Sequence, residues 1–407
     1  ARTRARARVS GRARRVGLTA EWAELAGRSL ARQFPAAGRD GTCRQRTLDE
    51  VVEAIAAIGP IQSQTARSPF LALAARLPGA DHETLSAAYE SMMIVRGSTI
   101  RGTVHTSIPE HHRVLDATTR IGQRALWART LRLVDRTLED AWAGIESYAA
   151  TTWRTPDELQ AHLTGWIATE DPEATPRLAG PAGRYFSFGH GGLLRRPLAG
   201  AWSGQGAPGY RTAATLLGDG EARRALQADP EAMADAALDL HLRAHGPSSR
   251  QDLAWWSGLG LRAVDAALAR RTDLVTTTGP DGRDYHEPAG IRAEDGWESL
   301  VPNGIRLLPE FDALLCGYDP PARARFVDPD NYRVLWMQDN GQLLAPLLID
   351  GRLGGFWRLT GSGRRRGLDV RWFAGRRRPH KAELDAPVSA LASALGLPVT
   401  DVAIARH

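Results

Sequence analysis

One order of elements recurs three times along this chain, and it constrains the fold more than any other feature. In each copy a capped helix is followed by a second helix or a turn, and then by short β-rich sequence with glycine turns. The caps are at Thr47, Thr155 and Ser248, each with a glutamate or glutamine three residues later, which is the pattern of a capping box. The recurrence predicts three similar units in series.

The β-rich part of each copy is expected after its helices. A strand is predicted over Ser98–Ile108 in the first copy and over Leu193–Leu198 in the second. In the third, strands over Leu274–Thr278 and Arg283–His286 flank a turn at Gly279–Gly282. Helix, turn, helix and hairpin is the order of a winged helix. Proteins that never meet DNA also use this order, but three copies in series on a basic chain favour DNA binding.

From about Asn303 the pattern changes to short strands with Asn-Gly and Asp-Gly turns, which favour tight antiparallel hairpins. The predicted strands are Arg333–Met337, Leu343–Ile349, Gly354–Leu359 and Asp369–Phe373. A helix from about Ala382 to Leu395 is expected to end the chain. These elements predict a small antiparallel sheet or barrel.

The predicted fold class is therefore α+β, with tandem winged-helix domains followed by a C-terminal antiparallel β-barrel. A chain of 407 residues is long enough for several such units. The predicted units are a basic disordered tail (1–17), three winged-helix domains (18–150, 151–240 and 241–302) and a β-barrel with a C-terminal helix (303–407).

The charge is biased toward arginine. The net charge is +6, and Lys381 is the single lysine. Arginine suits bidentate contacts with phosphate and guanine, although a GC-rich genome accounts for most of this bias. With one lysine, in a polar stretch, repair chemistry is expected to use water rather than a Schiff base. Seven arginines lie within the first fifteen residues. This tail either contacts nucleic acid without sequence preference or has no role, and both interpretations stay open.

Several classes of protein are not indicated by the sequence. No run of 18 apolar residues predicts a membrane span, and the N-terminal stretch lacks the apolar region of a secretory signal. Cys43 and Cys316 make neither a disulfide framework nor a zinc site. We therefore expect a cytoplasmic, nucleoid-associated monomer that uses no metal or other cofactor.

The segment Gly59–Phe70 contains two glutamines, Gln62 and Gln64, between the end of one helix and the start of the next. Side chains alternate along extended backbone, so the two amides are expected on one face. Such a pair offers donors and acceptors without charge and can hold a water or a ribose oxygen. Taken alone, a Gln-x-Gln pair is more often an ordinary polar loop.

The chain resembles the AlkZ-like DNA glycosylases of the azinomycin-resistance type, from about residue 20 to 400. Each matching motif is weak alone, whereas their order and spacing are specific. The motifs are Gly59–Leu77, Arg101–His105, His245–Pro247 with Trp255–Leu259, Leu307–Asp312 and Pro346–Trp357. The resemblance implies tandem winged helices, a C-terminal β-barrel, and an active site with a Gln-x-Gln or Gln-x-Asp pair.

The resemblance also implies a function. Gln62 and Gln64 would be catalytic in a monofunctional DNA glycosylase that removes bulky cationic N7-alkylguanine or N3-alkyladenine adducts and unhooks interstrand crosslinks. The partner would be double-stranded DNA carrying such adducts, and the role self-resistance to a genotoxic natural product. The chain departs from the family pattern at Ser63, usually aliphatic, which is expected to point away from the site. It departs again at Glu110–His112, where an aspartate is frequent.

Further residues are predicted to support this site. Arg101, Thr103 and His105 would share one face of the strand Ser98–Ile108 and shape the pocket or hold a phosphate, unless they are structural. Asp312 either orients a partner or caps a turn. The predicted DNA-binding arginines are Arg67, Arg195, Arg196, Arg364, Arg365 and Arg366. Arg195 and Arg196 form a basic wing suited to a groove. Arg364–Arg366 lie in a loop that is either a phosphate clamp or a solvated hairpin tip.

Two other functions stay open from the sequence. A winged-helix transcription regulator without catalysis would share the charge and the three segments, but it needs neither the glutamine pair nor the barrel. A drug-sequestering protein would bind the free alkylator without DNA.

Overall fold

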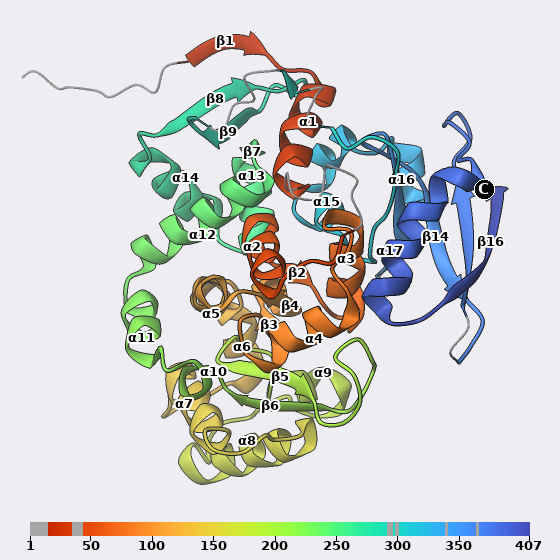
Figure 1. Cartoon of the computed structure of the whole chain (residues 1–407). Helices are drawn as coiled ribbons and strands as arrows, with labels where there is room; N and C mark the ends of the chain where they lie inside the picture. The colour runs from red at the N-terminus through yellow and green to blue at the C-terminus, as the bar shows by residue number, and fades with distance from the viewer. Residues whose placement is uncertain (1–14, 35–43, 291–295, 298–300, 338–340, 364–365) are drawn as a thin grey trace, which may run out of the picture.

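The computed structural model describes residues 15–34, 44–290, 296–297, 301–337, 341–363 and 366–407. Three groups of elements lie around a central region (Figure 1). A sheet with β8 and β9 lies at one end, a sheet with β5 and β6 lies at the other, and a curled sheet with β14 and β16 lies at the side. None of the described helices combines the length and apolar character needed to cross a bilayer.

The helices are short and most begin at a polar cap or a proline. They are α1 (Trp22–Gln33), α2 (Leu48–Ile58), α3 (Ser68–Arg76), α4 (His82–Glu90), α5 (Pro109–Gly122), α6 (Arg124–Leu131), α7 (Leu138–Tyr148), α8 (Pro156–Glu170), α9 (Gly180–Tyr185), α10 (Ala213–Leu217), α11 (Gly220–Ala228), α12 (Pro230–His245), α13 (Arg250–Ser257), α14 (Leu261–Arg270), α15 (Ala313–Cys316), α16 (Pro329–Leu335) and α17 (Asp385–Leu395), with 3-10 turns η2 (Ile100–Gly102), η4 (Pro320–Arg325) and η5 (Lys381–Leu384).

The strands form four sheets in the described residues. Their orders are β1 (Arg15–Thr19), β8 (Leu274–Thr278), β9 (Asp284–Pro288), β7 (Ser248–Ser249); β2 (Ile61–Gln62), β4 (Thr103–Ser107), β3 (Val95–Thr99), β5 (Leu193–Pro197), β6 (Pro208–Thr212); β10 (Ile305–Leu307), β13 (Ala345–Ile349), β14 (Arg352–Thr360), β15 (Arg366–Trp372), β16 (Val399–Arg406); and β11 (Trp336–Met337) with β12 (Gln342–Leu343).

The predicted fold class is confirmed, because the chain is a mixed α+β protein whose C-terminal sheet is strongly curled into half a barrel. The capping boxes predicted at Thr47 and Thr155 are present. In the third copy the box lies one residue later than predicted, with Ser249 as the cap and Asp252 as its partner. A shorter aspartate side chain at the third helical position makes the reciprocal bond there.

Sheets and cores join segments that are distant in sequence. Strand β3 pairs with β5, so the first two winged-helix segments share one sheet, and β1 pairs with β8 of the third. One hydrophobic core runs from the first segment into the C-terminal sheet through Ile55, Phe70, Leu347, Val370 and Leu391. The domain boundaries at 150, 240 and 302 stay predictions.

Four expectations about local structure are wrong. Ser98–Ile108 is two strands, β3 and β4, because left-handed backbone at Arg101 and Gly102 folds the segment into a hairpin. Residues 333–335 belong to α16, which begins at a proline. Strand β16 follows α17 and pairs parallel with β15, so α17 is the crossover that a parallel pair requires. Residues 15–17, predicted as tail, lie in β1.

Candidate active site

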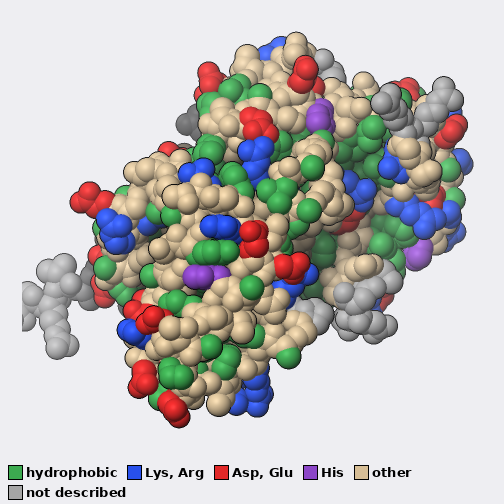
Figure 2. All heavy atoms as spheres, turned by 90° about the horizontal axis from the view of Figure 1, so that it is seen from below, with side chains coloured by type: hydrophobic (Ala, Val, Ile, Leu, Met, Phe, Trp, Pro, Cys, Tyr) green, Lys and Arg blue, Asp and Glu red, His purple; other side chains and the backbone are tan. Residues whose placement is uncertain are grey.

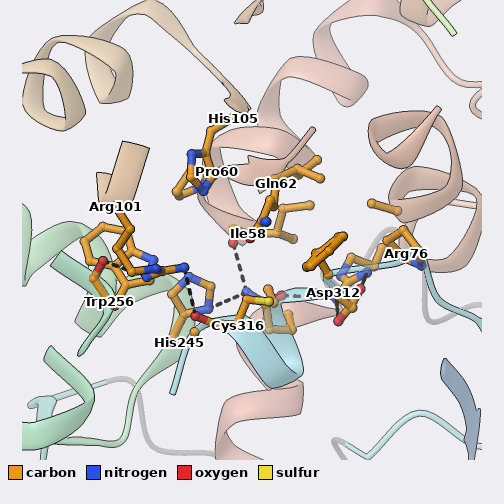
Figure 3. A pocket seen from close by; sticks show the side chains of 17 residues that line it. Ile58, Pro60, Gln62, Arg76, Arg101, His105, His245, Trp256, Asp312 and Cys316 are labelled. Atoms are coloured by element: carbon orange, nitrogen blue, oxygen red, sulfur yellow. Dashed lines mark hydrogen bonds and ion pairs between the residues drawn. The ribbon is translucent and has the colours of Figure 1, made fainter. Parts of the chain in front are cut away.

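A shallow pocket lies where the first and third winged-helix segments meet the C-terminal region. It encloses about 20 Å³, which is room for about one water molecule and not for a base. Figure 3 places Arg101 and Trp256 on one side of it and Arg76 with Asp312 on the other. The lining residues come from α1, α2, β2, α3, η2, β4, α12, α13, α15 and the segments beside them: Gln33, Ile58, Pro60, Ile61, Gln62, Ala72, Arg76, Arg101, His105, His245, Trp256, Pro309, Phe311, Asp312, Ala313, Cys316 and Gly317.

The glutamine segment enters the pocket because of how α2 ends. Gly59 has a φ of 79°, and a Cβ there would lie 2.9 Å from the Cβ of Ala244, so glycine alone fits. Strand β2 then pairs with β4, which places Gln62 opposite His105. The Ser63 hydroxyl donates to Ile61 O, and its Oγ lies 2.9 Å from Thr106 Oγ1 on the far side of the strand. The expectation that Ser63 points away from the site is confirmed.

Gln62 and Gln64 lie on one face, as predicted. The Gln62 Nε2 amide donates to Gln64 Oε1 at 2.8 Å. Gln62 lines the pocket and is 9% exposed, whereas Gln64 is exposed at the rim. Among the described residues neither Gln62 Oε1 nor Gln64 Nε2 has a hydrogen-bond partner. The pair therefore offers an acceptor and a donor to water or to a sugar hydroxyl.

Arg101 lines the pocket, but from a turn rather than from a strand. Its backbone is left-handed, with a φ of 54°. Its guanidinium donates to Trp256 O at 2.8 Å and to Trp255 O at 3.3 Å. These carbonyls end helix α13, where no intrahelical N–H reaches them, so Arg101 satisfies the helix end and complements its dipole. These contacts direct the guanidinium to backbone carbonyls rather than to a phosphate.

Thr103 and His105 do not share a role. Thr103 does not line the pocket, and its hydroxyl donates to Ile100 O within the hairpin turn. His105 lines the pocket at 3% exposure, and its Nδ1 lies 2.9 Å from Thr99 Oγ1 and 3.0 Å from Thr103 O. Burial, followed by the nearby charge of Arg101, lowers the pKa of His105 to about 3. The imidazole is therefore neutral at physiological pH.

A buried ion pair forms the wall opposite Arg101. Arg76 and Asp312 share two hydrogen bonds of 2.9 Å, and each side chain is 1% exposed. Asp312 Oδ1 also accepts from Leu314 N at 3.0 Å and so caps α15, as one of the two predicted alternatives has it, whereas a role in orienting a partner stays a prediction. Asp312 is the single carboxylate among the described lining residues, and both its oxygens are engaged. The pocket thus presents no free carboxylate.

Sequence reasoning did not identify Gln33, Arg76 or His245 as pocket residues. The Gln33 amide donates to Ile58 O and Ala244 O, accepts from Arg76, and lies 3.1 Å from His245 Nδ1. Burial lowers the pKa of His245 well below its usual range, so it too is neutral. One feature of the sequence could have indicated the role of Arg76: it ends the apolar run Leu71–Ala75 and is therefore expected to be buried, and a buried arginine requires a partner.

The predicted DNA-binding arginines are spread over the molecule. Arg67 pairs with Glu310 at 2.5 Å, and Arg196 pairs with Glu90 and stacks against the Trp202 ring. Arg195, on β5, lies opposite Tyr210 of β6. Arg366 begins β15 and donates to Gly361 O. Arg364 and Arg365 lie outside the described residues. Figure 2 shows charges of both signs interspersed on one face, so that face has no continuous basic stripe.

A mixed α+β fold therefore surrounds a pocket that Gln62 lines, with Gln64 hydrogen-bonded to it, and the described lining residues offer no free carboxylate. Over residues 55–394 the sequence matches the family described as DNA glycosylase AlkZ-like. The chain belongs to this family of DNA glycosylases.

A solved structure supports the same fold. The Streptomyces sahachiroi DNA glycosylase AlkZ has a TM-score of 0.72 to this chain at 19% sequence identity. The alignment covers 95% of this chain and 100% of the other. No curated protein matches the sequence.

Buried neutral histidines predict an acid-sensitive fold. Burial lowers the pKa of His105, His112, His190 and His241 to about 3. Below pH 6.5 these histidines bind protons in the unfolded chain but not in the folded chain, so the free energy of unfolding decreases as the pH is lowered. The decrease is about 1.4 kcal/mol per pH unit for each histidine, until the pH reaches the pKa of the folded state. Urea unfolding at pH 7, 6 and 5 measures this slope. His112→Gln is expected to reduce this slope relative to the wild-type chain; an unchanged slope in that variant contradicts the prediction.

Proposed function

We propose that this chain is a monofunctional DNA glycosylase of the Gln-x-Gln form. Its substrates are bulky cationic N7-alkylguanine or N3-alkyladenine adducts in double-stranded DNA, including those in interstrand crosslinks, and its role is self-resistance to a genotoxic natural product. The proposal rests mainly on the Gln62–Gln64 pair, which joins the interior of the pocket to the exposed rim by a hydrogen bond of 2.8 Å.

The chemistry needs no strong acid or base. Alkylation makes the purine cationic, so it leaves with the electron pair of the C1′–N9 bond and becomes neutral without being protonated. Water forms the new bond to C1′ and loses its proton to solvent, while the sugar passes through an oxocarbenium-like state. Amide oxygens can orient the water and place partial negative charge near the sugar. The absence of a free carboxylate among the described lining residues agrees with a substrate that is already activated.

The size of the pocket supports a bulky substrate. An enclosed space of about 20 Å³ admits water but not a purine. Enzymes that extrude a base into a closed pocket limit the size of what they accept. Here the base stays outside the enclosed space while C1′ approaches the glutamine pair, so substituents on the base meet little steric restriction.

Release of base from a series of duplexes tests this function. We expect N7-alkylguanine to be released at similar rates as the alkyl group grows, and uracil at least about 100-fold more slowly, because uracil must leave as an anion whereas the cationic purine leaves as a neutral base. The assay counts abasic sites under single-turnover conditions. Comparable release of uracil, or a steep loss of rate with adduct size, contradicts the proposal. Sequence-specific binding without base release favours a regulator, and calorimetric binding of free alkylator without DNA favours sequestration.

A further inference from the structure

Left-handed backbone marks the pocket at two positions. In the described residues five non-glycine residues have a positive φ, and two of them, Arg101 and Phe311, line this pocket. Phe311 has a φ of 59°. Such backbone is costly for a bulky side chain and persists where the surrounding structure enforces it, frequently at functional sites.

Two ion pairs hold the turn that contains Phe311. On its C-terminal side Asp312 binds Arg76 through both carboxylate oxygens. On its N-terminal side Glu310 binds Arg67 at 2.5 Å. Arg67 is the N-cap of α3 and Arg76 is its last residue, and α3 follows the glutamine segment. The position of Phe311 is therefore coupled to α3, the helix that follows the segment with Gln62 and Gln64.

Phe311 is also the accessible aromatic side chain of the pocket. Of the rings among the described lining residues, His105, His245 and Trp256 are 3% exposed or less. Phe311 is half-buried, with part of the ring packed against the C-terminal core and the remainder available to the pocket. A base too large to enter the enclosed space must lie against the rim, where this ring is available.

We propose that Phe311 is a specificity-determining residue whose ring face binds the cationic purine. This inference rests on the glycosylase function proposed above. An aromatic face attracts a cation through its quadrupole, and it distinguishes a positively charged purine from a neutral one of the same shape. Because the positive charge passes from the base to the sugar as the bond breaks, a ring on the base contributes to binding of the lesion more than to the rate of the bound complex.

The test compares binding of a cationic lesion with binding of a neutral isostere. The probes are duplexes with 2′-fluoro-N7-methylguanine, which is charged and resists hydrolysis, and with 7-methyl-7-deazaguanine, which is neutral. We expect the wild-type chain to prefer the cationic duplex about five- to thirty-fold, and Phe311→Leu to lose that preference. Phe311→Trp is expected to retain it. Leucine is also apolar, and the left-handed backbone at position 311 is as unfavourable for leucine as for phenylalanine. The wild-type chain and Phe311→Leu therefore differ mainly in the aromatic ring.

Controls separate this inference from packing and from the proposed function. Phe356 is half-buried and packs against the same C-terminal core but does not line the pocket, so Phe356→Leu is expected to leave the preference unchanged. On duplex with N7-methylguanine that lacks the 2′-fluorine and can be hydrolysed, Phe311→Leu is expected to raise KM with little change in kcat. A preference that survives in Phe311→Leu overturns the role of the ring. Wild-type failure to release N7-methylguanine instead overturns the glycosylase proposal, whatever the binding ratio.

Discussion

Replacement of Gln64 by alanine is expected to slow release of a cationic purine by about 100-fold or more while DNA affinity stays the same. Removal of one preorganised polar group at a reacting centre typically has an effect of this size. Gln64 is exposed, and its one described hydrogen bond is to Gln62, so its loss should not affect the fold. Single-turnover rates, the Kd for undamaged duplex and the thermal midpoint together measure the effect.

Matched variants sharpen this test. Thr65→Ala changes the next side chain, which does not line the pocket, and is expected to retain the wild-type rate. Gln64→Glu supplies a carboxylate at the same position and is expected to retain activity, since a carboxylate also orients water and stabilises positive charge on the sugar. Gln62→Ala is less informative because Gln62 is buried. A Gln64→Ala rate close to that of the wild type would show that the pair is structural.

Removal of the Arg76 guanidinium is expected to destabilise the chain by about 3–5 kcal/mol, because Arg76→Met leaves the Asp312 carboxylate buried and unpaired. Gln33 loses a partner as well. Urea denaturation should show a lower midpoint at an unchanged slope. Base release measured well below that midpoint would also decrease if the turn with Phe311 moves.

Two comparisons identify the cause of this destabilisation. The double variant Arg76→Met/Asp312→Asn removes both charges and keeps a side chain that can cap α15, so it is expected to recover most of the stability. Arg250→Met breaks the pair with Asp265, whose side chains are 42% and 48% exposed, and is expected to cost about 1 kcal/mol or less. A single Arg76→Met variant as stable as Arg250→Met would contradict the prediction.

Local features of this chain were predictable from sequence because neighbouring residues determine them. The capping boxes at Thr47 and Thr155 require four consecutive residues, and the shared face of Gln62 and Gln64 requires extended backbone alone. The hairpin at Arg101 was not predictable, because left-handed backbone at an arginine is unfavourable until the ends of α13 and α15 supply carbonyls for its side chain. Strand β16 was missed because its partner β15 lies beyond an intervening helix.

By itself, the sequence determined the capping boxes at Thr47 and Thr155, the arginine-rich composition and the shared face of the amide pair, since none of these depends on residues that are far apart in the chain. The tertiary structure decided what surrounds that pair. The Arg76–Asp312 contact joins residues 236 positions apart, and it forms the pocket wall and holds the turn of Phe311. Such a contact depends on how α3 and the C-terminal region pack in one core, which no local pattern specifies.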